Sequence, residues 1–261
     1  MPRSPRRWID DVARARAARR WERLASQVGR MPLADLRDID DEARSLRRSL
    51  NRLVARADRR IDALRPGAEP LDLPAGTDWR WRPLFLAGPI APRGIAAPDS
   101  GTRLGDEAAV WHDCPQNALV LRQARNKSSA ELSPHSLLLE TLGFDGSFLS
   151  ISIDLPAEAL DGLTRSHIVR LAAVVSVERP MNIFGRLNVG HGPNTDQLLR
   201  HLGDLHPGHP QSLVTEFDMY LIEMNEKRLE KIWLDLIFES PRMNAVRISD
   251  LFLSRHLRAE I

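Results

Sequence analysis

The stretch VRLAAVVSVE, residues 169–178, decides the fold class because apolar side chains occupy every second position. Its odd-numbered residues are Val, Leu, Ala, Val and Val. A period of two is typical of a β-strand that buries one face. The same rhythm recurs in further stretches, and these expected strands cover residues 149–155, 183–189, 215–221, 232–238 and 246–252.

Three weaker patterns, near residues 108–112, 118–125 and 136–142, bring the expected number of strands to eight or nine. After residue 105, a short helical pattern occurs only at 195–202. Parallel strands need long crossover helices, and their absence favours antiparallel pairing. We therefore expect a mainly β fold in which an antiparallel jelly-roll β-sandwich over 106–261 follows an N-terminal helical hairpin or coiled coil.

Residues 1–65 show helical rather than strand spacing. Apolar residues recur every three or four positions over 8–28, and Gly29 and Pro32 end this pattern. Over 36–64 the intervals alternate between three and four, which is a heptad pattern. The first stripe has few large side chains, so self-association into a homo-oligomer is one way to bury the second.

Residues 66–105 contain 7 prolines and 6 glycines, a density that helices and central strands do not tolerate. We expect a Pro/Gly-rich linker packed on the next domain. Trp79 and Trp81 are the side chains expected to hold it there, since exposed tryptophan is unusual. The predicted domains are thus 1–65, 66–105 and 106–261.

The formal charge of +2 hides a difference between the two ends of the chain. Residues 1–65 hold 18 arginines and 10 acidic residues, whereas residues 66–261 hold 19 basic and 25 acidic residues. The basic start fits either a solvated helix face or contact with a polyanion. Nucleic acid is not expected as a partner, because the strand region is acidic and lacks basic-aromatic clusters.

Composition excludes several classes of protein. An apolar content of 43% and a charged content of 28% are ordinary for a folded domain and exclude disorder of the whole chain. The apolar runs are far shorter than the ~20 residues that cross a bilayer, and the start of the chain lacks a secretory pattern, so we expect a cytoplasmic location. The single cysteine, Cys114, excludes an internal disulfide.

Catalytic and cofactor motifs are missing from the sequence. It has no dinucleotide-binding glycine pattern, phosphate loop, nucleophile elbow or zinc-protease helix, so we expect no cofactor and favour a protein that is not an enzyme. His201, His206 and His209 share one region, which we interpret as accidental clustering rather than a metal site. A hydrolytic alternative would pair the carboxylates of Asp218 and Asp235.

Polar residues on the wet faces of the expected strands are the candidate binding residues. Arginine and asparagine would orient ligand hydroxyls, aspartate would accept hydrogen bonds from them, and tryptophan would stack on a sugar ring. A glycine-rich loop after the 183–189 strand adds a histidine and an asparagine. The candidates are Arg186, Asn188, His191, Asn194, Trp233 and Asp235.

These patterns predict a non-enzymatic binding protein whose carbohydrate-binding-like sandwich recognises a saccharide or another polar ligand. The alternative is a cytoplasmic scaffold or adaptor. In that case the basic helices of residues 1–65 would contact a partner protein or an anionic membrane surface.

Several strings resemble an uncharacterised alphaproteobacterial family of unknown function, and the resemblance covers most of the chain. They are WHDCP at 111–115, LRQARN at 121–126, FDGSFLS at 144–150, RLNVGHGPN at 186–194 and WLDLIFE at 233–239. The family supplies no activity or catalytic residue. The C-terminal pattern from Trp233 to Ser254 also resembles galactose-binding-like jelly rolls, which implies a last strand that completes a sheet.

Overall fold

The computed structural model describes residues 5–62, 73–126 and 132–259. In the two long helices it does not describe the side chains of residues 5–14, 44, 47–48, 51–52 and 54–62. Residues 66–72 of the predicted linker therefore lie outside the described part of the chain. The described side chains also exclude five positions of the predicted helical stripes: Trp8, Val12, Ala57, Ile61 and Leu64.

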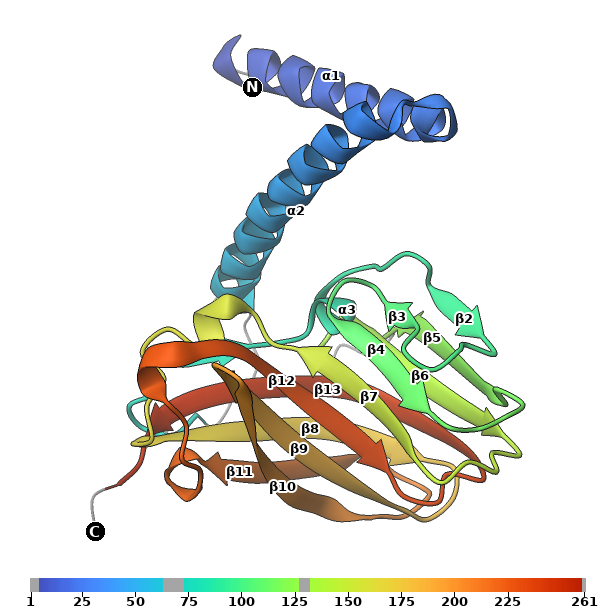
Figure 1. Ribbon diagram of the computed structural model, residues 1–261, viewed down its shortest axis with the longest axis vertical. Helices are drawn as coiled ribbons and strands as arrows, with labels where there is room; N and C mark the ends of the chain where they lie inside the picture. Colours follow the sequence, from blue (N-terminus) through green and yellow to red (C-terminus); the bar gives the residue numbers. More distant parts are fainter. Residues whose placement is uncertain (1–4, 63–72, 127–131, 260–261) are drawn as a thin grey trace. The chain divides into compact units, whose positions relative to one another are not determined.

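The chain divides into two compact units, residues 1–67 and 68–261. The first unit contains α1 (Pro5–Gln27), the 3-10 turn η1 (Val28–Arg30) and α2 (Leu33–Asp62) (Figure 1). Across the turn, Arg20 Nη2 donates to Glu42 Oε2 at 3.1 Å. None of the described helices is long and apolar enough to cross a membrane.

The second unit is built from two β-sheets, whose strand pairs are all antiparallel. Sheet A has the order β11 (Gln211–Asp218), β8 (His167–Val177), β13 (Met243–Leu257), β6 (His135–Leu142), β5 (Leu119–Arg125) and β2 (Gly94–Ala96), with β1 (Trp79–Trp81) paired to β13. Sheet B has the order β10 (Asn194–Leu205), β9 (Met181–His191), β12 (Leu229–Phe238), β7 (Leu149–Asp154), β4 (Ala108–His112) and β3 (Arg103–Leu104). The short helical elements are α3 (Leu84–Ala87), η2 (Ala157–Ala159), η3 (Met219–Leu221) and η4 (Glu226–Arg228).

The chain moves repeatedly from one sheet to the other after β6. Strands β6, β8, β11 and β13 lie in sheet A, while β7, β9, β10 and β12 lie in sheet B. This exchange between two facing antiparallel sheets confirms the predicted mainly β, jelly-roll sandwich, and the two helices precede it as expected. Pairing of those helices into a coiled coil stays a prediction.

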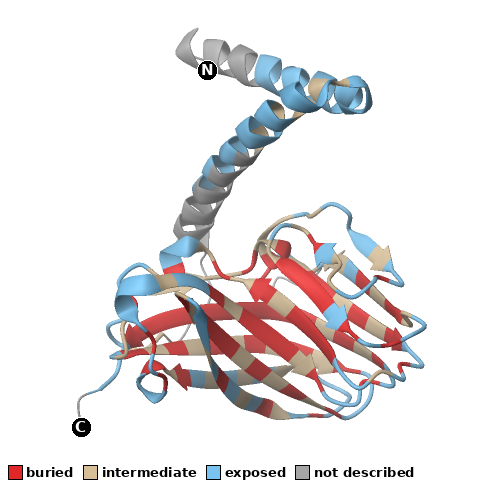
Figure 2. Ribbon diagram, in the orientation of Figure 1, coloured by how far each residue is buried: buried red, intermediate tan, exposed pale blue. Residues whose placement is uncertain are grey.

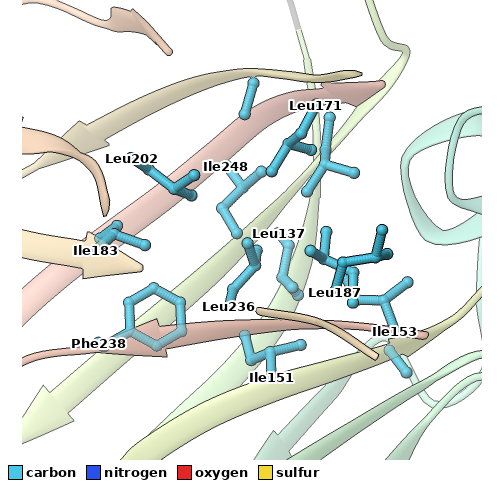
Figure 3. Close-up of a cluster of buried hydrophobic side chains, with 14 of the residues drawn as sticks. Leu137, Ile151, Ile153, Leu171, Ile183, Leu187, Leu202, Leu236, Phe238 and Ile248 are labelled. Atoms are coloured by element: carbon cyan, nitrogen blue, oxygen red, sulfur yellow. The ribbon is translucent and has the colours of Figure 1, made fainter. Parts of the chain in front are cut away.

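The core lies between the sheets and is made by alternate residues of each strand. In β8 the odd positions from 167 to 177 are buried and the even positions are half-buried, as the twofold pattern predicts (Figure 2). Leucine, isoleucine and phenylalanine from both sheets meet in the middle (Figure 3). Each fully buried side chain of this kind contributes about 1.5–3 kcal/mol relative to an exposed one.

The segment before the main strands packs on the sandwich through β1. Trp79 and Trp81 contact the core, as expected for the two indoles. Next to them Arg255, which is buried, donates to both oxygens of Asp78 at 2.8 and 3.0 Å. This guanidinium holds the pKa of Asp78 below its usual value. Within the same segment, Arg82 pairs with Asp250 at 2.8 Å.

The sequence pattern of residues 195–202 resembles that of a short helix, but these residues form part of strand β10. Leu198 and Leu202 are buried four residues apart, a spacing that imitates a helix. The residue between them on the inner side, Arg200, donates from Nε to the carbonyl of Glu216 at 3.2 Å. Because this edge strand has a polar residue on its inner side, its sequence does not alternate between apolar and polar residues.

The last strand, β13, departs from the expected pattern through a β-bulge. The sequence pattern predicts that Val246, Ile248 and residues 250 and 252 all face inward. The pairing with β8 shifts between Ile248 and Asp250. Beyond the bulge Leu251 and Leu253 enter the core. One extra residue exchanges the two faces of a strand, so the second half of the expectation was wrong.

The WHDCP and FDGSF segments form one interlocked turn. The Asp113 carboxylate accepts from Ser147 N at 2.7 Å, Ser147 Oγ at 2.5 Å and Phe148 N at 3.1 Å. These hydrogen bonds hold the pKa of Asp113 below its usual value. Gly146 lies against this carboxylate, and a β-carbon there would be 2.4 Å from Asp113 Oδ1 and 2.8 Å from Cys114 N.

Replacing Gly146→Ala should therefore lower the free energy of unfolding by roughly 1–3 kcal/mol, as expected for a group forced into a filled site. Gly88→Ala is the matched control, since a β-carbon at Gly88 has no neighbour within 4 Å. Urea unfolding of both variants and the native protein measures the difference. Equal stability of the two variants would contradict the interlocked turn.

Glu107 binds the start of the short helix α3. Its Oε1 accepts from Phe85 N at 3.0 Å, and the backbone of Leu84 also donates to the carboxyl. Burial raises the pKa of Glu107 to about 8. Because the unfolded chain ionises this carboxyl near its ordinary value of 4.5, the folded protein holds one more proton between about pH 5 and 8.

The free energy of unfolding should therefore fall with rising pH in that window, by up to about 1.4 kcal/mol per pH unit from this group. Glu107→Gln should reduce the slope, because the amide oxygen still accepts from Phe85 and does not ionise. Urea unfolding of both proteins from pH 5 to pH 9 tests this. Parallel curves would show that Glu107 does not carry the additional proton.

Candidate functional site

The outer face of sheet B brings four of the six candidate residues together. Asn188 pairs with Trp233, and Arg186 pairs with Asp235, across the neighbouring strands β9 and β12. All four have the parity opposite to the core residues of these strands, so they lie on one face. The pairs follow one another along the strands, which makes a compact group of cation, carboxylate, amide and indole.

Asp235 is the centre of this group. Its Oδ2 accepts from Arg186 Nε at 3.0 Å, Arg186 Nη2 at 2.9 Å and Asn188 Nδ2 at 2.9 Å. The carboxylate is almost fully buried, whereas the Arg186 side chain is 37% exposed. The three hydrogen bonds all end on the same oxygen, so Oδ1 keeps its lone pairs for another donor.

Asn188 supports the group from below rather than facing solvent. Only 1% of this residue is exposed, and its Nδ2 also approaches the backbone carbonyls of Arg186 and Trp233 at 3.1 and 3.4 Å. A side chain held in this way fixes the orientation of Asp235 and does not itself reach a ligand. Asn188 is therefore a positioning residue.

Trp233 lies beside a second charged group. Lys231 Nζ is 5.1 Å from the centre of the indole ring and 2.8 Å from Asp154 Oδ1. Arg103 Nη2 reaches the other oxygen of Asp154 at 3.2 Å. Gly190 lies next to the indole, since a β-carbon there would be 3.8 Å from the ring.

Trp111 belongs to the same face, although it was not among the candidates from sequence. It pairs with Ser150, and its neighbour Ala109 pairs with Ser152 of β7. The indole rests on Gly101 and remains 47% exposed. Alternation over 108–112 places Trp111 outward, but a pattern of five residues is too short to identify it as a binding residue.

Small side chains separate the two indoles. Ala109, Ser150 and Ser152 occupy the sheet between Trp111 and the Asp235 group, and Ser152 pairs directly with Asp235. Beyond the group, the rings of Phe184 and His201 have their centres 5.0 Å apart and their planes tilted by 49°. The face thus has two indoles, small side chains between them and a fixed polar group beside these.

The structure does not join the two loop candidates to this group. His191 is the last residue of β9, is buried, and places Nε2 2.9 Å from Asp196 Oδ2. Its parity is that of the core residues Leu187 and Val189, opposite to Asn188. Asn194 begins β10 and is exposed at the hairpin.

The catalytic alternatives do not assemble among the described residues. Asp218 lies on the outer face of sheet A, so it faces away from Asp235 on the other sheet. The Cys114 backbone N–H donates to His112 Nδ1 at 3.2 Å, while the thiol lies 3.4 Å from Asp145 Oδ1. Within the described ranges, no three histidine, cysteine or acidic side chains are grouped so that they could hold a metal ion.

Three solved structures show what the strand arrangement of this chain is similar to. The enzymatically active domain of tailspike protein 4 from bacteriophage CBA120 has a TM-score of 0.41 and 5% identity, and covers 56% of this chain and 19% of its own. The CBM22-1 xylan-binding domain of Xyn10C from Paenibacillus barcinonensis has a TM-score of 0.38 and 12% identity, with 67% and 98% covered. A putative sugar binding protein from Bacteroides thetaiotaomicron has a TM-score of 0.38 and 13% identity, with 60% and 91% covered.

This chain thus spans less than a fifth of the tailspike domain. At TM-scores below 0.5, these likenesses say nothing about what the protein binds. No curated protein matches the chain by sequence. A family of unknown function, DUF6478, matches residues 1–261, and the protein belongs to that family.

Proposed function

We propose that the outer face of sheet B binds a saccharide chain without reacting with it. The observation that carries this proposal is the fixed Arg186–Asp235–Asn188 group lying on the same face as two indoles, the exposed Trp111 and the half-buried Trp233. Saccharides present an apolar C–H face and a ring of hydroxyls. An aromatic plate beside planar hydrogen-bonding groups complements both.

The spacing of the indoles favours a chain over a single sugar. Trp111 pairs with Ser150, whereas Trp233 pairs with Asp154, four residues further along β7 and on its other side. Strand geometry separates the two positions by about 13 Å along the strands and about 10 Å across them. Each indole can therefore stack on a different ring of one oligosaccharide.

Ligand hydroxyls between the indoles would meet polar groups that are already oriented. The exposed part of Arg186 can donate, while Asp235, whose side chain is only 6% exposed, holds that guanidinium in place. Asn188 keeps the carboxylate in place, so binding does not require these side chains to reorganise. Ser152, next to Asp235, adds a hydroxyl.

The charges of this face favour a neutral ligand over a polyanion. Arg186 is paired with Asp235, and both Lys231 and Arg103 are paired with Asp154. Each cation thus has a carboxylate partner close by, which reduces the attraction of the face for a highly charged chain. Saccharides without acidic groups fit this balance.

A glycan array followed by calorimetric titration of the best oligosaccharide tests the proposal. Trp111→Ala and Trp233→Ala should each weaken the affinity by about tenfold, because each removes one stacking plate worth roughly 1 kcal/mol or more. Tyr220→Ala is the control, since Tyr220 is 57% exposed and lies on η3, away from this face. Its affinity should equal that of the native protein.

Arg186→Gln removes the cation that faces Asp235. It should weaken saccharide binding and also lower the thermal midpoint by several degrees, because the almost fully buried Asp235 carboxylate loses its charged partner. Titration well below that midpoint measures the affinity. Absence of any saccharide ligand on the array would overturn the proposal. So would equal affinities of the two tryptophan variants and the Tyr220→Ala control.

A further inference from the structure

The second half of α2 carries an apolar stripe that is exposed as far as the described residues of its unit show. Leu46, Leu50 and Leu53 occupy the heptad positions of one helix face and are 40%, 51% and 63% exposed. Leu36 and Ile39, which precede them on the stripe, are half-buried. In that earlier part of α2, Glu42 accepts a hydrogen bond from Arg20 of α1.

The charges of α2 divide at the same place. Residues 33–43 contain five acidic residues and one arginine, whereas residues 44–60 contain seven arginines and one aspartate. The uncovered leucines therefore lie in the strongly basic half. A helix with an apolar stripe, a basic polar face and low overall hydrophobicity is typical of segments that lie in the interface of a membrane.

We propose that the basic second half of α2 binds the surface of a bilayer that contains anionic phospholipid. The leucines would enter the boundary between headgroups and acyl chains, and the positive charge of residues 44–60 would be attracted to the lipid phosphates. Each arginine near an anionic surface strengthens binding by about fivefold. This contact is separate from the saccharide face, which lies in the other unit.

A second copy of the chain fits this stripe less well. A parallel pair of α2 helices would place seven arginines of one copy beside seven of the other. An antiparallel pair would bring opposite charges together, but Leu53 would then need the part of the stripe at Leu36 and Ile39, which is already half-buried. An anionic bilayer satisfies both the charges and the uncovered leucines.

Vesicle flotation of the full-length protein tests the proposal. The protein should float with vesicles of phosphatidylcholine and phosphatidylglycerol, and should stay at the bottom with phosphatidylcholine alone. Raising the salt to about 0.5 M should weaken binding at least tenfold, because it shortens the range of the electrostatic attraction. Replacing Arg44, Arg48 and Arg52 by glutamine should weaken binding about a hundredfold.

The apolar contribution is tested by Leu46→Ser and Leu50→Ser together, which should reduce binding at least tenfold. Leu33→Ser is the matched control on the same helix, since Leu33 is 67% exposed but lies in the acidic half and off the stripe. It should bind vesicles like the native protein. Circular dichroism confirms that the variants keep their helices and strands.

Two results would overturn the proposal. Equal flotation with both kinds of vesicle would show that anionic lipid is not recognised. Absence of flotation, with a dimer in sedimentation that Leu50→Ser converts to a monomer, would show that the stripe covers a second copy instead.

Discussion

Burial of one face of each sheet against the other is the constraint on which the rest of the sandwich depends. In β9 and β12 the inward positions are held by residues such as Leu187, Val189, Leu234 and Leu236, all buried. Because successive side chains of a strand point to opposite faces, the neighbouring positions lie on the outer face of the sheet. Arg186, Asn188, Trp233 and Asp235 are brought together on the outer side because their neighbours form the core.

A rigid polar group follows from the same register. A carboxylate as deeply buried as Asp235 is stable as an ion only when partners compensate for the lost solvent. Arg186 and Asn188 supply those partners from the adjacent strand, and their three hydrogen bonds to Asp235 all end on Oδ2. The same hydrogen bonds that stabilise the buried carboxylate also fix the orientation of this polar group on the outer face of sheet B.

The helical unit has a different physical character. Its described side chains bury little, because two helices cannot enclose a core comparable to that of the sandwich. The apolar stripe of α2 remains at the surface beside the dense positive charge of residues 44–60. The bilayer contact proposed above would complete the burial of this stripe.

The sequence by itself determined the class of the fold and the parity of most strands, since a twofold rhythm such as that of 169–178 has one simple structural meaning. It also placed Arg186, Asn188, Trp233 and Asp235 on polar strand faces. Only the tertiary structure decided which strands are neighbours, and so that these four meet, that Trp111 shares their face and that His191 does not. It also decided the strand at 195–202 and the bulge after Ile248. Pairing between distant segments sets these features, and periodicity along one segment carries no information about its partner.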